Sequence, residues 1–166
     1  MQRIAFGGGC HWCTEAIFQQ LSGVSQVEQG WVSSTHLEAT TPSEAVIVHF
    51  DSTYISLDIL TEIHLFTHNA TSNHSFREKY RSAVYTFSDI QEKEAQNILK
   101  QKQKLFNKPL VTKVYPFGEF KLNDKTYLNY YKSNPDKPFC QVRIEPKLQI
   151  LFQKYHMYLN IQTIML

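Results

Sequence analysis

The sequence predicts an α+β fold: a two-layer sandwich with a ferredoxin-like split β-α-β core and an irregular C-terminal segment. Two observations support this prediction. Candidate strands and helices alternate in the order β-α-β-β-α-β-α-β, which contains the split β-α-β arrangement. The 166 residues are 42% hydrophobic and only 19% charged, which is enough apolar material for one core. We therefore expect a single domain over residues 1–166.

The first half of the chain contains the clearest strands. Residues 2–7 are a candidate strand, in which three apolar residues precede the glycines 7–9, which allow a turn. The apolar spacing over 12–21 then predicts a helix. Residues 24–32 alternate like a second strand, and 44–50 give the strongest strand signal in the chain.

The middle of the chain continues the alternation. A serine able to cap a helix begins the segment 56–68, and another directly precedes 89–105, so both segments are expected to be helical. Strands are expected at 82–87, before the second of these helices, and at 110–116, after it.

The C-terminal part gives weaker signals. A short helix is expected over 125–132, and a last helix is expected to begin after Pro146. Between them we expect a loop, over about 133–146, that carries Cys140. The apolar tail over 157–166 could pack on the core or on a partner.

Charge and composition exclude several classes of protein. The net charge of +2 is too low for a nucleic-acid-binding surface. No window approaches the ~18 apolar residues of a membrane span, and the N-terminus has no signal-peptide pattern. We therefore expect a cytoplasmic monomer without nucleic-acid or membrane partners, in a compartment where thiols stay reduced.

Cys10 follows three glycines at the junction between a predicted strand and a predicted helix. A thiol there faces unpaired backbone N–H groups and the positive end of the helix dipole. That setting favours the thiolate, which is the reactive form of cysteine. Cys13 lies three residues later on the same helical face, so a disulfide between the two is feasible. The sequence thus predicts a reactive cysteine on a strand-to-helix elbow.

The candidate residues also have simpler explanations. The cysteines could be small core residues. Structural zinc needs four ligands, whereas the two N-terminal cysteines and Cys140 supply three and no histidine shows ligand spacing, so we expect no metal or cofactor. Trp12 could be a core residue or the wall of an apolar pocket beside the sulfur. Glu44 could be a solvated strand end or a buried acid, and Tyr80 could simply pack.

Five segments match, in the same order, the motifs of one known family. Residues 8–15, Gly-Gly-Cys-His-Trp-Cys-Thr-Glu, are similar to its Gly-Cys-Phe-Trp-x-x-Glu signature, and 43–46 to its His-Ala-Glu-Val-Val strand. Residues 79–85, Lys-Tyr-Arg-Ser-Ala-Val-Tyr, resemble its Gln-Tyr-Arg-Ser-Ala-Ile-Tyr segment, and 109–112 its Pro-Ile-Val-Thr strand. Asn134-Pro135 before Cys140 resembles its Asn-Pro-x-Gly-Tyr-Cys tail. The chain thus resembles peptide methionine sulfoxide reductase A.

The chain departs from that pattern at a few positions. His11 stands where the family has phenylalanine, and Ser75 stands about where it has aspartate. One of the two pocket tyrosines has no counterpart, and the Tyr-His-Gln segment is blurred around Tyr127. These differences concern substrate preference and efficiency more than the class of reaction.

The resemblance implies a peptide-methionine (S)-S-oxide reductase that acts on free or protein-bound methionine sulfoxide. The thiolate of Cys10 would attack the sulfoxide sulfur, and Glu44 would supply a proton to the sulfoxide oxygen, with Tyr80 as a second donor. Trp12 would hold the S-methyl group and His11 would flank the same pocket. Phenylalanine at position 11 would be tolerated.

The resemblance also implies how the enzyme is recycled. Cys10 would become a sulfenic acid, a second thiol would form a disulfide with it, and thioredoxin would reduce that disulfide. Cys140 is favoured as the resolving thiol, with Cys13 as a relay. The alternative is a thiol–disulfide oxidoreductase that uses Cys10 and Cys13 as a redox pair, which explains neither Glu44 nor Tyr80. A redox-responsive binding protein is a third hypothesis.

Overall fold

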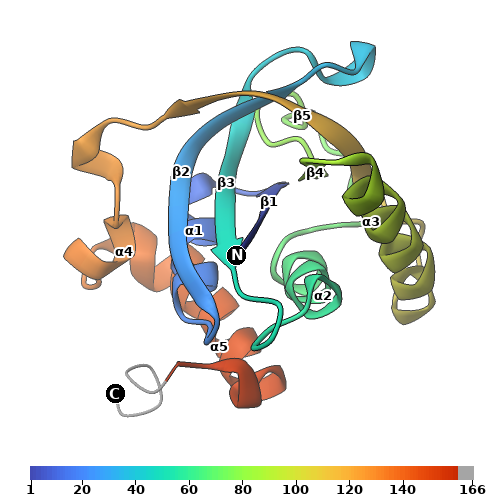
Figure 1. Cartoon of the computed structure of the whole chain (residues 1–166). Helices are drawn as coiled ribbons and strands as arrows, with labels where there is room; N and C mark the ends of the chain where they lie inside the picture. The colour runs from blue at the N-terminus through green and yellow to red at the C-terminus, as the bar shows by residue number, and fades with distance from the viewer. Residues whose placement is uncertain (161–166) are drawn as a thin grey trace.

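The computed structural model describes residues 1–160, in which five strands form one closed sheet (Figure 1). The order around the sheet is β1-β3-β2-β5-β4, and β4 also pairs with β1. All neighbours are antiparallel except β4 and β5, which are parallel. The strands are β1 (Gln2–Gly7), β2 (Val24–Ser34), β3 (Ser43–Phe50), β4 (Ala83–Thr86) and β5 (Lys113–Leu122).

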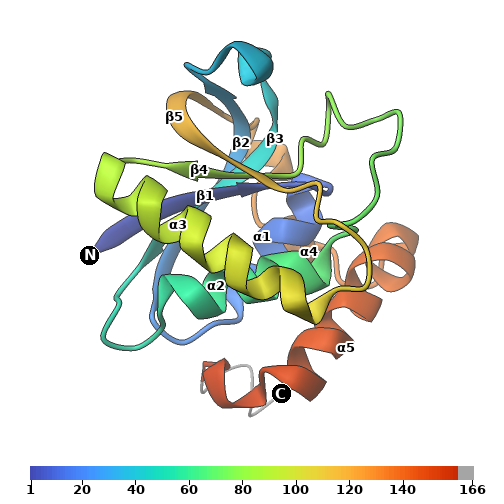
Figure 2. The ribbon, with the colours of Figure 1, turned by 90° about the vertical axis from the view of Figure 1, so that its right-hand side faces the viewer.

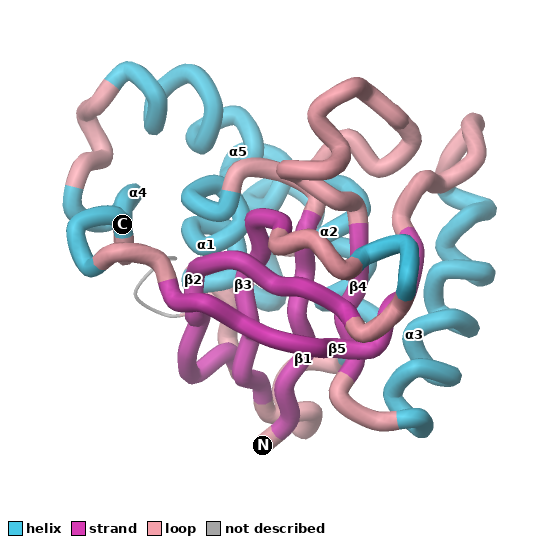
Figure 3. Tube along the Cα trace, turned by 90° about the horizontal axis from the view of Figure 1, so that it is seen from above, coloured by secondary structure: helices cyan, strands magenta, loops and turns pink. Residues whose placement is uncertain are grey.

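Helices α1, α2 and α5 lie together on one side of the sheet, and α3 runs alongside (Figures 2 and 3). The helices are α1 (His11–Gln19), α2 (Leu57–Thr67), α3 (Asp89–Lys102), α4 (Tyr130–Ser133) and α5 (Glu145–Lys154). The two predicted serine caps are present: Ser56 Oγ accepts from the Ile59 N–H at 3.2 Å, and Ser88 Oγ from the Gln91 N–H at 3.1 Å. No helix within residues 1–160 is long and apolar enough to cross a membrane.

The predicted α+β class is confirmed, but the open two-layer sandwich needs correction because β5 closes the sheet. This strand pairs with β4 on one side and β2 on the other, so in Figure 1 it crosses from one edge to the other. It extends six residues beyond the predicted end at 116. A register shift between Ser33 and Ser34 bends β2 where the two strands meet.

Alternation along the strands divides the buried residues into two clusters. Large side chains such as Ile4 and Phe6 of β1 face the helices, together with Phe18 of α1. The inside of the closed sheet is lined by smaller residues, including Ala5 and Ala45. They leave room for the rings of Tyr85 and Tyr115. Since successive side chains of a strand point to opposite faces, β1 contributes to both clusters and fixes the elbow that follows it.

The segment over 133–146 is not the loop expected from the sequence. The predicted helix over 125–132 divides into a 3₁₀ turn (Lys125–Tyr127) and α4. A single π-helical turn (Cys140–Ile144) leads directly into α5. Cys140 is fully buried in the helix-facing cluster, because this turn packs its sulfur among apolar side chains. In the tail, Leu159 packs into the same cluster, and residues 161–166 lie outside the described part of the chain.

Closure of the sheet depends on the absence of a side chain at Gly30. A Cβ there would lie 2.1 Å from the carbonyl oxygen of Lys121 on β5. We expect Gly30→Ala to lower the free energy of unfolding by about 1–3 kcal/mol, because the backbone must move to relieve this overlap. Urea unfolding measures the loss. Gly9→Ala is the control, since its nearest neighbour lies at 3.4 Å; equal losses in both variants would contradict this account.

Candidate active site

The strand-to-helix elbow expected from the sequence is present. Gly8 has a φ of +144°, which favours glycine, and a Cβ there would lie 2.5 Å from the ring of His68. Burial lowers the pKa of His68 to about 3, so a neutral imidazole supports the turn. Cys10 occupies the N-cap of α1, and the backbone N–H groups of Cys13 and Trp12 act to lower the pKa of its thiol. The helix N-terminus thus stabilises negative charge on Cys10.

Cys10 and Cys13 form a hydrogen-bonded pair of thiols. The Cys10 thiol donates to the Cys13 sulfur, which raises the pKa of Cys10 and lowers the pKa of Cys13. Burial opposes ionisation of both, while the charges of Lys147 and Arg143 lower the pKa of Cys13 further. The sequence predicted a thiolate on Cys10 alone. The pKa directions instead favour ionisation of Cys13, with the proton on Cys10, which is the more exposed of the two thiols.

A cavity of about 470 Å³ opens beside this pair. Its walls include both thiols, Tyr80, Phe139 and Lys147. The amine of Lys147 lies 3.4 Å from the point where a Cβ on Gly9 would stand, so a cation from α5 covers the glycine turn. His11, Trp12 and Glu44 do not line this cavity.

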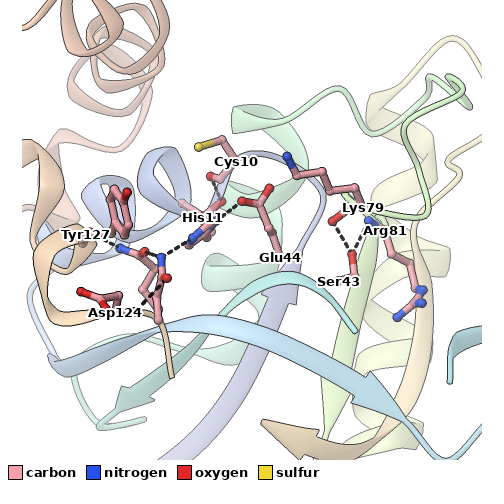
Figure 4. Close-up of polar contacts among 11 residues, drawn as sticks. Cys10, His11, Ser43, Glu44, Lys79, Arg81, Asp124 and Tyr127 are labelled. Atoms are coloured by element: carbon pink, nitrogen blue, oxygen red, sulfur yellow. Dashed lines mark hydrogen bonds and ion pairs between the residues drawn. The ribbon is translucent and has the colours of Figure 1, made fainter. Parts of the chain in front are cut away.

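Glu44 is buried at the start of β3, with 5% of its surface exposed. Its backbone N–H donates to the Lys79 carbonyl at 2.9 Å. One carboxylate oxygen, Oε1, contacts His11 Nδ1, and the other, Oε2, has no hydrogen-bond partner among residues 1–160. A hydrogen bond with Tyr80, together with the charges of Tyr80, Glu44 and Cys10, raises the pKa of Lys79. Glu44 and Tyr80 therefore both act on the ammonium group of Lys79. Figure 4 shows Lys79 on the same side of the site as Glu44 and Cys10.

His11 is 4% exposed and lies behind the cavity, where it joins a polar network (Figure 4). Its Nε2 lies 2.6 Å from the amide nitrogen of Asn123, which also donates to Gln29 Oε1 at 2.6 Å. The Gln29 amide in turn donates to the Tyr127 carbonyl at 3.0 Å. Sequence reasoning missed Gln29 and Asn123. Only Gln29 gave a signal, as a polar residue at a position that alternation assigns to the face of Val27 and Trp31.

Trp12 is stacked against the C-terminal segment. Its ring lies nearly parallel to that of Tyr130, with centroids 4.0 Å apart, and Phe139 packs edge-on at 5.3 Å. The predicted role of Trp12 as a wall for the S-methyl group stays a prediction, because the ring does not line the cavity beside the thiols. Instead, the ring holds the chain that leads toward Cys140 against α1.

Glu15 anchors the same segment from the next turn of α1. Its carboxylate accepts from the backbone N–H groups of Asn129 at 3.1 Å and Tyr130 at 3.2 Å. Burial raises the pKa of Glu15, and these hydrogen bonds, together with one from Gln29, oppose that rise. The glutamate of the N-terminal motif is thus a structural anchor in this chain.

Tyr80 is placed by the segment that precedes β4. The guanidinium of Arg77 donates to the carbonyls of Gly8 at 2.8 Å, Tyr80 at 2.9 Å and Asn69 at 2.6 Å. This single side chain therefore ties the Tyr80 segment to the glycine turn. Within residues 1–160, no cluster of three or more histidine, cysteine, aspartate or glutamate side chains is arranged to hold a metal ion.

Known proteins are similar to this chain in both sequence and fold. The family described as peptide methionine sulfoxide reductase matches residues 2–158. Peptide methionine sulfoxide reductase MsrA of Deinococcus radiodurans is 34% identical, over 93% of this chain and 82% of that protein.

Two solved structures share the fold at lower identity. Methionine sulfoxide reductase A of Corynebacterium diphtheriae has a TM-score of 0.70 at 23% identity, over 81% of this chain and 75% of that one. Mxr1 from Saccharomyces cerevisiae, solved in complex with Trx2, has a TM-score of 0.59 at 20% identity, over 78% of this chain and 84% of that one. Because the family match covers residues 2–158, the chain belongs to the peptide methionine sulfoxide reductase family.

Proposed function

We propose that this protein reduces the S epimer of methionine sulfoxide, free or in proteins, as a peptide-methionine (S)-S-oxide reductase. One observation carries the proposal within the family. A half-buried thiol lies at a helix N-terminus beside a second thiol, and a buried carboxylate lies nearby with one unpartnered oxygen. Thiol, acid and cavity are the parts that this reaction requires.

The first step transfers oxygen from substrate to Cys10. When the shared proton passes to Cys13, the negative charge moves to Cys10, whose thiolate attacks the sulfoxide sulfur. Glu44 delivers a proton to the sulfoxide oxygen, with Tyr80 as a second donor. This attack forms a bond between the Cys10 sulfur and the substrate sulfur. The protonated oxygen then passes to the Cys10 sulfur as both that S–S bond and the S–O bond of the substrate break, so methionine leaves with the S–S electron pair and Cys10 carries the oxygen as sulfenic acid. The substrate is thus reduced by two electrons and Cys10 is oxidised by two.

The second step closes a disulfide and releases water. The sequence favours Cys140 as the resolving thiol, but the contacts favour Cys13, which is already hydrogen-bonded to Cys10. Burial, followed by the charge of Glu145, raises the pKa of Cys140, so this thiol is a poor first nucleophile. We propose that Cys13 attacks the sulfenic acid and that Cys140 then takes over the disulfide by exchange.

Thioredoxin is the proposed reductant of the final disulfide. A likeness of fold to Mxr1, which was solved in complex with Trx2, supports this assignment. The alternative function, a thiol–disulfide oxidoreductase using Cys10 and Cys13, accounts for the thiol pair. It gives no role to the buried Glu44 or to Tyr80, so sulfoxide reduction is favoured.

The test of the function is turnover that depends on the sulfoxide. With thioredoxin, thioredoxin reductase and NADPH, we expect the wild-type protein to consume NADPH only when the S epimer is present. Cys10→Ser should abolish turnover because a hydroxyl is a far weaker nucleophile at neutral pH. Circular dichroism of Cys10→Ser provides the control for folding. Sulfoxide-independent reduction of an added disulfide would favour the alternative, and comparable activity in Cys10→Ser would refute the mechanism.

The cation on α5 should control the reactivity of the thiol pair. Lys147→Met removes a positive charge that lowers the pKa of Cys13, so the thiolate fraction at neutral pH should fall. We expect alkylation by iodoacetamide at neutral pH to slow by about 3-fold to 10-fold, and the rates to converge at high pH where the pair is fully ionised. Lys154→Met, on the same helix but over the ring of Phe66, is the matched control. Equal slowing in both variants would argue against a direct effect of charge.

The order of disulfides can be read by peptide mass after one equivalent of sulfoxide. We expect a Cys10–Cys13 link first, and a link that includes Cys140 only later, because Cys13 already contacts Cys10 whereas Cys140 is buried in the core. Cys140→Ser should still reduce one equivalent at the wild-type rate. A first link between Cys10 and Cys140, with Cys13→Ser unaffected, would restore the preference drawn from the sequence.

A further inference from the structure

His11 replaces the phenylalanine of the family motif, and its imidazole contacts the proposed acid. The ring is packed between two tryptophans, with centroids 6.0 Å from Trp12 and 5.3 Å from Trp31. Its Nδ1 contacts Glu44 Oε1 and its Nε2 faces Asn123. Nε2 therefore lies within hydrogen-bond distance of a buried amide, whereas Nδ1 forms no hydrogen bond among residues 1–160 and has only its ion-pair contact with Glu44. Packing fixes the plane of the ring.

Two backbone groups determine the direction of every hydrogen bond in this network. The Asp124 N–H donates to Asn123 Oδ1 at 2.8 Å, so the amide nitrogen of Asn123 must face His11 and Gln29. The Tyr127 carbonyl accepts from the Gln29 amide at 3.0 Å, so Gln29 Oε1 must face Asn123. Reversing either amide would place two donors or two acceptors in contact.

This direction fixes the proton on His11. Because the Asn123 amide donates to Nε2, that nitrogen accepts and carries no hydrogen. The ring proton therefore resides on Nδ1, which contacts Glu44 Oε1. When Glu44 takes up a proton, the hydrogen on Nδ1 already lies against Oε1, so we place the acid proton on Oε2. That is the oxygen without a partner among residues 1–160.

We infer that His11 is a positioning residue for this reaction: its Nδ1–H holds one oxygen of Glu44, so that the acid proton is presented from the other oxygen to the substrate. The inference rests on the proposed role of Glu44 as the proton donor. The other charged groups near the pair do not replace this contact. Lys79 faces Glu44 from the segment before β4, and Glu15 faces His11 from α1.

This inference changes what we expect of a phenylalanine at position 11. The resemblance alone implied that it would be tolerated. In this chain, however, phenylalanine would leave Glu44 Oε1 and the Asn123 amide buried without a partner. The carboxylate would also lose the contact that distinguishes its two oxygens. The loss should therefore appear in kcat, which depends on delivery of the proton, more than in KM.

The experiment is a double-mutant cycle between His11 and Glu44, measured with the S epimer of methionine sulfoxide and dithiothreitol. We expect His11→Phe to lower kcat by about 10-fold to 100-fold, as when a partner that orients a site group is removed, with KM nearly unchanged. His11→Asn, whose amide can donate from a position near Nδ1, should recover most of that loss. In the Glu44→Gln background, His11→Phe should cause little further change in kcat.

A matched control is the other histidine–glutamate pair of the sheet. His49 lies 3.5 Å from Glu28 at a more exposed position, and His49→Phe should leave kcat near the wild-type value. If His11→Phe lowers kcat by the same factor with and without Glu44, or does not lower it, the inference is wrong. If Glu44→Gln retains full activity, the inference is also wrong, although sulfoxide reduction by Cys10 would stand.

A readout that is independent of catalysis comes from nitrogen-15 NMR of the histidine rings in the full-length wild-type protein. We expect His11 to show a hydrogen on Nδ1 and an unprotonated Nε2. A hydrogen on Nε2 would overturn the inference even if the kinetics agreed. This measurement also decides the matter if His11→Phe does not fold.

Discussion

The antiparallel pairing of β2 with β5 determines where the second half of the active site lies. It places the Asn123 N–H 2.9 Å from the Gln29 carbonyl at the end of β5. From that point the chain passes directly over α1, where the Glu15 carboxylate accepts the N–H groups of Asn129 and Tyr130. Without this pairing neither the network behind His11 nor the segment that leads to Cys140 would be held against the elbow.

The site places the Glu44 carboxyl and the two thiols in largely buried positions. The cations that lower the pKa of Cys13, Lys147 and Arg143, come from the C-terminal helical segment. A buried carboxylate without donors costs several kcal/mol, so Glu44 depends on the donor at His11. The thiol pair depends on the helix N-terminus and on Lys147 and Arg143 from the C-terminal helical segment. Both the proposed acid and the proposed nucleophile thus depend on groups that are far from them in sequence.

Local signals made the elbow and most of the strands predictable, because turn glycines, strand alternation and serine caps act over a few residues. The contacts that tune the site are of a different kind. His11 and Asn123 are 112 residues apart, and Asn123 and Gln29 are 94 apart. Nothing at 117–122 identified the part of β5 that closes the sheet. The same limit applies to Cys140, whose proline-flanked surroundings favoured a loop although tertiary packing buries it.

The network behind the cavity couples three side chains, so that replacing one changes the hydrogen bonds of the others: His11, Asn123 and Gln29. Removing one partner of a buried hydrogen bond costs about 1–3 kcal/mol, whereas replacing both by apolar groups of the same shape is nearly neutral. A phenylalanine at position 11 would therefore be accommodated best together with apolar residues in place of the two amides. In this chain the amides are present and their direction is fixed by Asp124 and Tyr127. A polar side chain that can face both Glu44 and the Asn123 amide therefore suits the position after the proposed nucleophile.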